Sequence, residues 1–397
     1  MFRNVPRILY LAPVPYASMA QRPHHLVHFL AHQVKAEVVW VEPMPSRLPR
    51  LNDLVLRLKE TAQTHEGRQR IPNVQVIPAP AFPAEPLSDG LVDLVTQRLT
   101  TQVMSHGSFD HLIIGKPSRL AIRLAKQLSL QSPGVEVTWD IMDDMPAFHT
   151  GRAAKRMQRQ ADALWSVVDS VWVSSSELLR LSTAALADRG STVFPQLVLN
   201  GIESKRYLGQ TRSIARKGDG RSDHSDHSDH SAESWRARLC LGYVGSIAPW
   251  MDWAQLSALA QARPQDTIEL IGPVHIPVPI LPPNIRLLPA VDHAEVPSVL
   301  EKFDWGLIPF VNNRLTRAVD PIKYYEYRAA GLPVLSTAFG EMRERTEPDG
   351  VWFWDEALKR PRLMDEVVAV HQPVGAEWIG AQDWSVRFGS HLPYILK

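Results

Sequence analysis

Short apolar runs alternate with longer amphipathic stretches along the first half of the chain. Each run is rich in Val and Ile and stops at Pro, Gly, Asp or Ser, which is typical of strands buried in a parallel sheet. We expect such strands at 7–12, 36–41, 74–78, 111–115, 135–140 and 170–174. Helices are expected between them, at 24–33, 87–106, 118–129, 152–168 and 176–188.

The same alternation starts again near residue 239. The second set of expected strands lies at 239–245, 267–272, 285–288, 304–309 and 333–337, with helices at 253–262, 296–303, 322–330 and 376–390. Strands that alternate with helices predict βαβ units. We therefore expect two α/β domains with doubly wound parallel sheets, facing each other across a cleft where the carboxyl ends of the strands would bind ligands.

A polar stretch at 208–234 separates the two sets of elements. It contains a threefold Ser-Asp-His repeat at Ser222–Ser231. The repeat has no apolar side chain whose burial would offset the entropy cost of ordering it. Its His and Asp residues could bind a metal weakly, but a flexible repeat does not fix ligand geometry. We expect a disordered linker or insertion there.

Composition narrows the function classes. The 397 residues include 43 Lys and Arg against 42 Asp and Glu, so the formal charge of +1 gives no argument for binding nucleic acid. Cys240 is the single cysteine, which excludes disulfides within the chain and cysteine-based zinc sites. The early apolar run is interrupted by Pro13 and Pro15 and is too short for a signal peptide. No apolar run is long enough to span a bilayer, so we expect a cytoplasmic protein.

The loop after the first strand of the second half contains Gly245 and Ser246. A residue without a Cβ at this point would let a phosphate approach backbone N–H groups at a helix N-terminus. The alternative is that Gly245 only satisfies turn geometry.

A helix that starts after Asp320-Pro321 would carry Lys323 and Glu326 on one face, because the two residues are three positions apart. A diphosphate requires a cation, and a ribose diol requires a carboxylate acceptor. The alternative is an ordinary surface ion pair. The three tyrosines interleaved with these residues favour a packed helix.

Adjacent carboxylates at Asp143 and Asp144 follow a strand of the first domain. Such carboxylates perturb each other's pKa, and either could act as general base toward a hydroxyl. The alternative is that one of them caps the following helix or turn. His149, just downstream, is a candidate for contact with sugar or phosphate, whereas a structural hydrogen bond is expected for His24 or His25.

Four basic residues share one helical face because they follow the spacing i, i+3, i+4 and i+7; they are Arg152, Lys155, Arg156 and Arg159. A solvated face explains them, and so does peripheral contact with anionic lipid. The amphipathic, basic stretch at 48–59 fits the same hypothesis.

The run P-x-K-x-x-E-Y-x-A-A-G-x-P-V-x-S-T at 321–337 resembles the nucleotide-sugar signature of the GT-B glycosyltransferases. It is most similar to glycosyl transferases group 1-like bacterial enzymes that build polysaccharides and cell-wall polymers, including teichuronic-acid-type transferases. Four other segments resemble the same group in the same order: RPHHL at 22–26, WDIMDDMPAF at 139–148, VLNGIESKRY at 198–207 and GYVGSIAPWMDW at 242–253.

The resemblance implies a GT-B fold with an acceptor-binding domain at 1–207, onto which the C-terminal helix within 376–397 packs back. A nucleotide-sugar-binding domain would occupy 235–375. Asp143 or Asp144 would be the catalytic base, and Arg22, His24 and His149 would lie on the acceptor side.

The resemblance also implies a donor site for a nucleoside diphosphate sugar, expected to be a UDP-sugar. Glu326 would accept from the ribose hydroxyls, whereas Lys323 and the Gly245-Ser246 backbone would face the diphosphate. Thr316 and Asp320 would reach phosphate or sugar. Many relatives carry a second glutamate eight positions before the ribose-binding one, and here that position is Ala318.

The implied reaction is a hexosyltransferase-like transfer to a hydroxyl of a saccharide or lipid-linked acceptor in polysaccharide or cell-envelope biosynthesis. The second domain shows no D-x-D-type carboxylate pair in a donor-site loop, so we expect no metal and no cofactor. One alternative is a non-hydrolysing UDP-sugar epimerase of the same architecture. Another is a non-catalytic nucleotide-sugar-binding scaffold, which Ala318 favours.

Overall fold

The computed structural model describes residues 5–18, 20–44, 71–78, 89–209, 238–360 and 362–391. The expected amphipathic stretch at 48–59 lies outside these residues, and so does the expected linker from residue 210 onward. The chain divides into two units, which we call the first unit (Met1–Asn200 with Trp384–Lys397) and the second unit (Gly201–Asp383).

The first unit contains a seven-stranded sheet with the order β3-β2-β1-β4-β5-β6-β7, and every pair of neighbouring strands is parallel. Its strands are β1 (Arg7–Leu11), β2 (Glu37–Val41), β3 (Val74–Ile77), β4 (His111–Ile114), β5 (Glu136–Ile141), β6 (Ser170–Val173) and β7 (Gln196–Leu197). The direction in which the chain adds strands reverses between β1 and β4, which marks a topological switch point.

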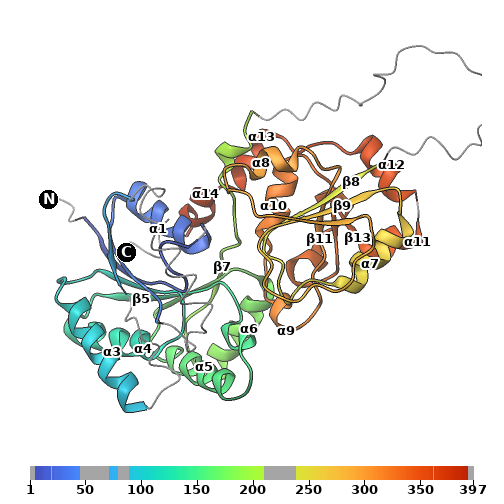
Figure 1. Cartoon of the computed structure of the whole chain (residues 1–397). Helices are drawn as coiled ribbons and strands as arrows, with labels where there is room; N and C mark the ends of the chain where they lie inside the picture. The colour runs from blue at the N-terminus through green and yellow to red at the C-terminus, as the bar shows by residue number, and fades with distance from the viewer. Residues whose placement is uncertain are drawn as a thin grey trace, which may run out of the picture. The chain divides into compact units, whose positions relative to one another are not determined.

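Helices cover both faces of this sheet (Figure 1). They are α1 (Arg22–His32), α3 (Asp89–Met104), α4 (Arg119–Gln131), α5 (Gly151–Leu164), α6 (Ser176–Ala187) and α14 (Trp384–Gly389), with a short 3-10 helix η1 (Met145–Phe148). Helices α1 and α14 lie on one face, and α3, α4 and α5 on the other. Side-chain caps start two of the helices, because the hydroxyls of Ser118 and Ser175 accept from Ala121 N and Leu178 N.

The second unit contains a six-stranded sheet with the order β10-β9-β8-β11-β12-β13, again with parallel neighbours. Its strands are β8 (Cys240–Val244), β9 (Thr267–Ile271), β10 (Ile285–Leu288), β11 (Trp305–Ile308), β12 (Val334–Ser336) and β13 (Val351–Phe353). The doubly wound α/β fold that the sequence predicted is confirmed in both units.

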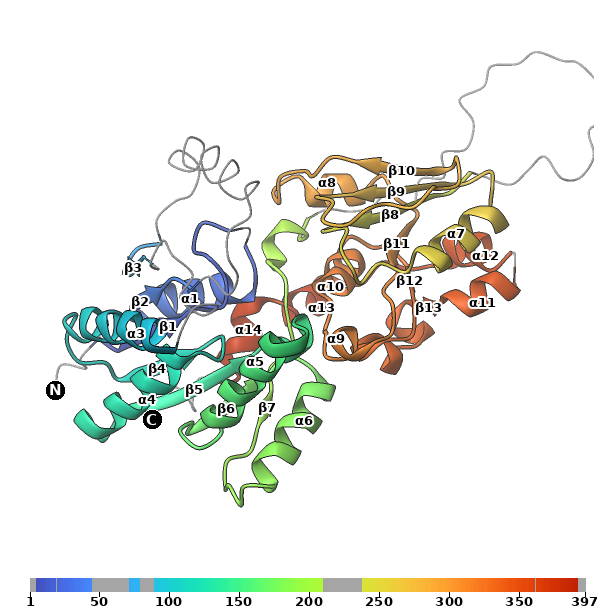
Figure 2. The same ribbon diagram turned by 60° about the horizontal axis from the view of Figure 1, so that its bottom comes forward.

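The helices of the second unit also lie on both faces of its sheet, with α7 and α11 on one face and α8 and α10 on the other (Figure 2). They are α7 (Trp253–Ala262), α8 (Val296–Leu300), α9 (Arg314–Arg317), α10 (Ile322–Ala329), α11 (Trp354–Lys359), α12 (Leu363–Val370) and α13 (Ala376–Ala381), with the 3-10 helices η2 (Ser204–Arg206), η3 (Gly340–Glu344) and η4 (Glu347–Asp349). Across the described part of the chain, no helix combines the length and apolar character needed to cross a bilayer.

The boundary between the units differs from the expected one at residue 207. Residues 201–209 belong to the second unit, and contacts at its other end explain why. Ser204 donates from its backbone N (3.0 Å) and its hydroxyl (2.6 Å) to Asp383 Oδ2. Ile202 N donates to Gln382 O at 2.9 Å.

The helix expected at 376–390 is two helices that belong to different units. Helix α13 stays with the second unit, and the return to the first unit begins at Trp384. There, Trp384 stacks on His25 with ring centroids 4.9 Å apart, and Phe388 packs against Phe29 at 5.8 Å. These aromatic contacts anchor α14 on α1.

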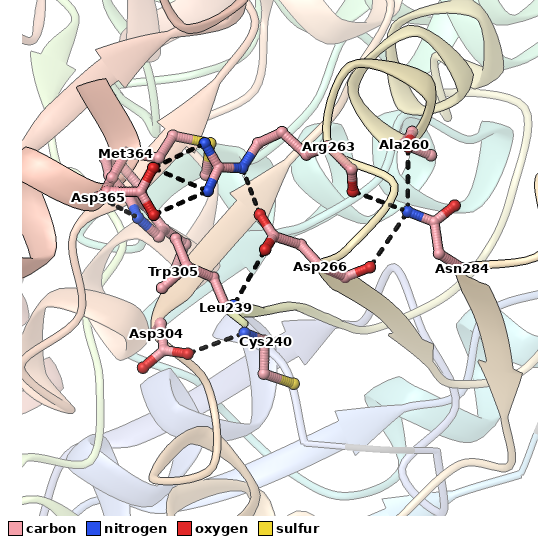
Figure 3. A network of polar contacts seen from close by, with 10 residues as sticks. All are labelled: Leu239, Cys240, Ala260, Arg263, Asp266, Asn284, Asp304, Trp305, Met364 and Asp365. Carbon is pink, nitrogen blue, oxygen red and sulfur yellow. Dashed lines mark hydrogen bonds and ion pairs between the residues drawn. The ribbon is translucent and has the colours of Figure 1, made fainter. Parts of the chain in front are cut away.

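A polar network closes the amino ends of the strands in the second sheet (Figure 3). The Arg263 guanidinium pairs with Asp266 and, at 3.0–3.1 Å, with Asp365. The Asp266 carboxylate also accepts from Leu239 N, just before β8. The two carboxylates therefore neutralise the largely buried Arg263 guanidinium. One of them also satisfies the backbone N–H of Leu239 at the amino end of β8.

Asn284, just before β10, completes this network. Its Nδ2 lies 3.0–3.1 Å from the carbonyl oxygens of Ala260, Arg263 and Asp266, so one side-chain amide satisfies backbone acceptors where α7 ends and β9 begins. A buried carbonyl that loses its partner costs free energy.

We predict that Asn284→Ala lowers the free energy of unfolding by about 1–3 kcal/mol, because Ala260 O and Asp266 O lose the side-chain amide that donates to them, whereas Arg263 O keeps the N–H of Asp266. Urea unfolding followed by circular dichroism measures the change. Asn312→Ala is the matched control, because its amide also donates to one backbone carbonyl but is exposed. Equal losses in the two variants would contradict the role given to Asn284.

Candidate functional site

Two glycines shape the carboxyl edge of the second sheet. Gly245 follows β8 with φ +145°, and a Cβ there would lie 2.4 Å from Lys323 Nζ. Gly272 follows β9 with φ +148°, and a Cβ there would lie 2.2 Å from Gly245 O. Both positions therefore require glycine, because the Lys323 ammonium approaches Gly245 closely and the Gly245 backbone approaches Gly272 closely.

The Gly245 N–H donates to Ile271 O at 2.8 Å, so this amide continues the pairing of β8 with β9. Contact of the Gly245-Ser246 backbone with a diphosphate stays a prediction. What Gly245 provides is the space in which the Lys323 ammonium lies. Ser246 follows, and its carbonyl accepts from the Tyr243 hydroxyl at 2.8 Å.

Helix α10 presents Lys323 to this loop. The Lys323 Nζ lies 5.2 Å from the centroid of the Tyr243 ring, a cation–π contact. The Tyr327 hydroxyl, on the same helix, accepts from Val244 N at 3.0 Å. Helix α10 is thus packed against the end of β8, as the interleaved tyrosines predicted, and the Lys323 ammonium lies beside Gly245.

Glu326 lies one turn further along α10. Its side chain is 14% exposed, and Oε1 lies 3.6 Å from Nε2 of His293, a residue in the loop after β10. The sequence analysis did not predict His293. Its signal is its position: like Gly245 and Gly272, it lies in a loop that follows a strand of the second sheet.

Thr316 and Asp320 hold the segment before α10 in place. Thr316 forms a capping box with Asn313 at the start of α9, and its hydroxyl donates to Val311 O. The buried Asp320 carboxylate accepts from the Tyr325 hydroxyl at 3.0–3.1 Å and pairs with Arg345 at 3.1 Å. Contact of either residue with phosphate or sugar stays a prediction.

The first unit has a pocket at the carboxyl ends of β1, β2 and β4, which include its topological switch point. It is lined by residues that directly follow these strands, among them Ala12, Glu42 and Lys116. The Glu42 carboxylate accepts from Tyr16 N at 2.9 Å, and burial raises its pKa. The sequence analysis missed Glu42 and Lys116, although the position of each after a strand is the signal that identifies them.

Asp143 and Asp144 lie in the loop after β5. Burial and the negative charge of Asp144 raise the pKa of Asp143 to about 7, and the positive charge of Arg22 opposes this rise. Asp144 occupies the N-cap position of η1, but its side chain makes no cap hydrogen bond there. The contacts at η1 therefore do not support the capping alternative, and Asp143 carries a carboxyl group that titrates near neutral pH.

Arg22 is buried, with 2% of its surface exposed. Its guanidinium lies 2.8–3.1 Å from the Asp140 carboxylate and donates to Val198 O at 2.7 Å. It therefore ties α1 to the end of β5 and to the segment after β7. These contacts give Arg22 a structural role, and its place on the acceptor side stays a prediction.

The two histidines expected near the acceptor differ in their surroundings. His24 Nδ1 accepts from Gln21 N at 3.2 Å, and Nε2 lies 3.1 Å from Tyr16 O. His24 therefore makes the structural hydrogen bonds that were the alternative to an acceptor role. His149 follows η1, and burial together with the positive charges of Lys116 and Arg156 lowers its pKa.

Helix α5 has an apolar and a basic side. Met157, Ala161 and Leu164 are buried against the unit, whereas the basic face is exposed at Arg152, Lys155 and Arg159. Phe148 precedes this helix and is 48% exposed. Among the residues that the structure describes, no group of three or more His, Cys, Asp or Glu side chains is placed to hold a metal ion.

No family model matches the chain. In sequence, the chain is similar to TuaH of Bacillus subtilis (strain 168), a protein provisionally assigned as a teichuronic acid biosynthesis glycosyltransferase, with 29% identity over 176 residues. That match covers 40% of this chain and 43% of the length of the relative.

Solved structures resemble the whole chain. The sucrose-phosphate synthase of Thermosynechococcus elongatus matches 98% of this chain and 99% of its own at a TM-score of 0.62 and 12% identity. A glycosyltransferase of Rickettsia africae matches 99% of both chains at 0.60 and 10%. An E. coli trehalose-6-phosphate structure bound with UDP-2-fluoro glucose matches 98% of both chains at 0.60 and 10%. These comparisons confirm the GT-B fold and the resemblance to GT-B glycosyltransferases that the motifs predicted.

Proposed function

We propose that the chain is a glycosyltransferase that moves a sugar from a nucleoside diphosphate sugar to a hydroxyl of a saccharide or lipid-linked acceptor. The placement of the Lys323 ammonium against Gly245, one turn from Glu326, carries this proposal. The sequence similarity to a teichuronic acid biosynthesis glycosyltransferase supports a role in the cell envelope. The E. coli structure with UDP-2-fluoro glucose, which has the same fold, supports a UDP-sugar as donor.

On the donor side, Lys323 stabilises the charge that develops on the leaving diphosphate. Its ammonium lies at the end of β8, against a ring face and a glycine, where the loops that follow the strands of a doubly wound sheet bind their ligands. Glu326 accepts from the ribose hydroxyls. A fixed cation that meets developing negative charge lowers the barrier without reorganisation.

On the acceptor side, Asp143 is the general base. Its carboxylate takes the proton of the acceptor hydroxyl as the oxygen attacks the anomeric carbon and the bond from that carbon to the diphosphate oxygen breaks. A base with a pKa near 7 combines a useful fraction of carboxylate with enough basicity to remove the proton. The neighbouring negative charge of Asp144 helps to maintain that pKa.

Lys323→Ala and Glu326→Ala should each reduce transfer by about two orders of magnitude or more, because each removes a group that holds or stabilises the donor. The assay is release of nucleoside diphosphate from UDP-sugars in the presence of acceptor, with urea unfolding as a check of the fold. Lys302→Ala, at an exposed lysine of the same unit, is the control. Near-normal turnover in both test variants would refute the donor site.

The raised pKa of Asp143 predicts how the transfer rate and the free energy of unfolding depend on pH. If Asp143 is the base, the rate rises with pH and levels off above about 7, and Asp143→Asn loses both the activity and this profile. Because the folded-state pKa lies above the ordinary value of 3.8, wild-type stability falls as the pH rises from about 4 to 7.

Asp143→Asn should remove that fall, so the variant gains unfolding free energy relative to wild type at pH 8 but not at pH 4. Urea unfolding at the two pH values measures the difference. An equal difference at both values would mean that the carboxyl does not titrate near neutrality. An active Asp143→Asn enzyme would move the base elsewhere.

We further propose that the protein works at the cytoplasmic side of the cell membrane, held by peripheral contact with anionic lipid. The exposed basic face of α5, with the exposed Phe148 ahead of it, supports this contact. Each basic residue near an anionic surface contributes about 1 kcal/mol to binding.

The double variant Arg152→Glu/Lys155→Glu should weaken binding to vesicles that contain anionic lipid by about tenfold or more. Co-sedimentation at low salt measures this. The matched control is Arg123→Glu/Lys126→Glu on α4, an exposed pair with the same spacing. Equal weakening by both double variants would show that binding depends on net charge alone, and no binding by the wild type would refute the contact.

A further inference from the structure

The segment that begins the second unit contacts the loop after β10, and the proposed function assigns no role to this contact. Arg206, the last residue of η2, pairs with Glu203, which directly precedes η2. The same guanidinium donates from Nη1 to the carbonyl oxygen of His293 at 3.0 Å. Two segments that are 87 residues apart in sequence are thereby joined beside α10.

Further contacts fix the loop that carries His293. Asp292 N donates to Glu295 Oε2 at 3.1 Å, and Glu295 N donates to Asp292 O at 2.9 Å. With Arg206 bonded to the intervening carbonyl, the backbone on both sides of His293 is held. The imidazole is therefore presented at a defined place, with Nε2 3.6 Å from Glu326 Oε1.

The His293 and Glu326 side chains both reach the surface, with 31% and 14% of their side chains exposed. On the protein side, the Tyr207 ring is buried, and burial together with the negative charge of Glu326 raises the pKa of its hydroxyl. Tyr207 thus stays neutral behind Glu326. The exposed fractions of His293 and Glu326 leave both side chains accessible to a ligand.

The distance between the two groups suits a ligand that bonds to both. At 3.6 Å, Nε2 and Oε1 are farther apart than an optimal N–H···O hydrogen bond. A hydroxyl group can donate and accept at the same time, a carboxylate accepts, and an imidazole N–H donates. A vicinal diol bound there would donate to Glu326 and accept from His293.

We propose that His293 is a nucleotide-binding residue that, together with Glu326, binds the ribose diol of the nucleoside diphosphate, and that the Glu203–Arg206 pair positions it. This inference rests on the proposed function, since it places the ribose at Glu326. It assigns to His293 and Arg206 the selection of ribose over deoxyribose.

The test is calorimetric binding of UDP, GDP and ADP to the full chain, followed by the 2′-deoxy and 3′-deoxy forms of whichever diphosphate binds. His293→Ala should weaken binding of the ribonucleotide by about 3–10-fold, the effect of one lost hydrogen bond. It should weaken at least one deoxy form much less, so that the preference for the hydroxyl shrinks.

Arg206→Met should reduce the same preference, and Arg206→Lys should not restore it, because the point charge of lysine does not reproduce the planar guanidinium that reaches both Glu203 and the His293 carbonyl. The matched control is Arg286→Met, at an exposed arginine on β10, which should leave the preference unchanged.

The outcomes separate this inference from the proposed function. If Lys323→Ala loses nucleotide binding but His293→Ala keeps the full preference for ribose, the donor site stands and the role of His293 is wrong. If Arg206→Met weakens ribose and deoxy forms equally, Arg206 is not a positioning residue. If the wild type binds none of the three diphosphates, the donor site itself is wrong.

Discussion

In both units, each strand runs parallel to its neighbours in the sheet, so each connection must return across a face of the sheet before the next strand begins. All strands therefore start at one edge and end at the other. In the second unit the starting edge is closed by buried polar contacts such as those of Arg263 and Asn284 (Figure 3). The other edge carries the loops that hold Gly245, Gly272 and His293, and its chemistry follows from this placement.

The two edges use positive charge in different ways. Arg263 lies between two carboxylates, Asp266 and Asp365, which compensate its charge and make it a structural element. Lys323 lies instead against the Tyr243 ring and the space left by Gly245. A ring face compensates an ammonium far less than two carboxylates do. An anionic ligand therefore gains more from Lys323, which is why the glycine loop and α10 form the candidate site.

Much of this arrangement is predictable from the sequence, because buried parallel strands are apolar on both faces and helices repeat every 3.6 residues. The short strands β7 and β13 and the helices α9, α11 and α12 were missed, because elements of a few residues leave little pattern. Lys323 and Glu326 were predicted, because their spacing within one helix shows their shared face. The position of His293 beside Glu326 and the buried ion pair of Arg22 depend on partners far away in sequence, such as Asp140, which lies 118 positions from Arg22. No local pattern reports such contacts.

Arg22 shows how a structural contact also acts on the chemistry. Its guanidinium bonds to Asp140 on β5, and its charge lowers the pKa of Asp143, which burial and Asp144 raise. Because Asp140 already compensates much of that charge, Arg22 offsets the rise only in part, and Asp143 titrates at about 7. A stronger positive charge nearby would lower the pKa of Asp143 further and make its carboxylate a weaker base. Without a positive charge nearby, the carboxyl group would stay protonated at neutral pH. Burial and Asp144 dominate the basicity of Asp143, and the arginine that anchors α1 to β5 moderates it.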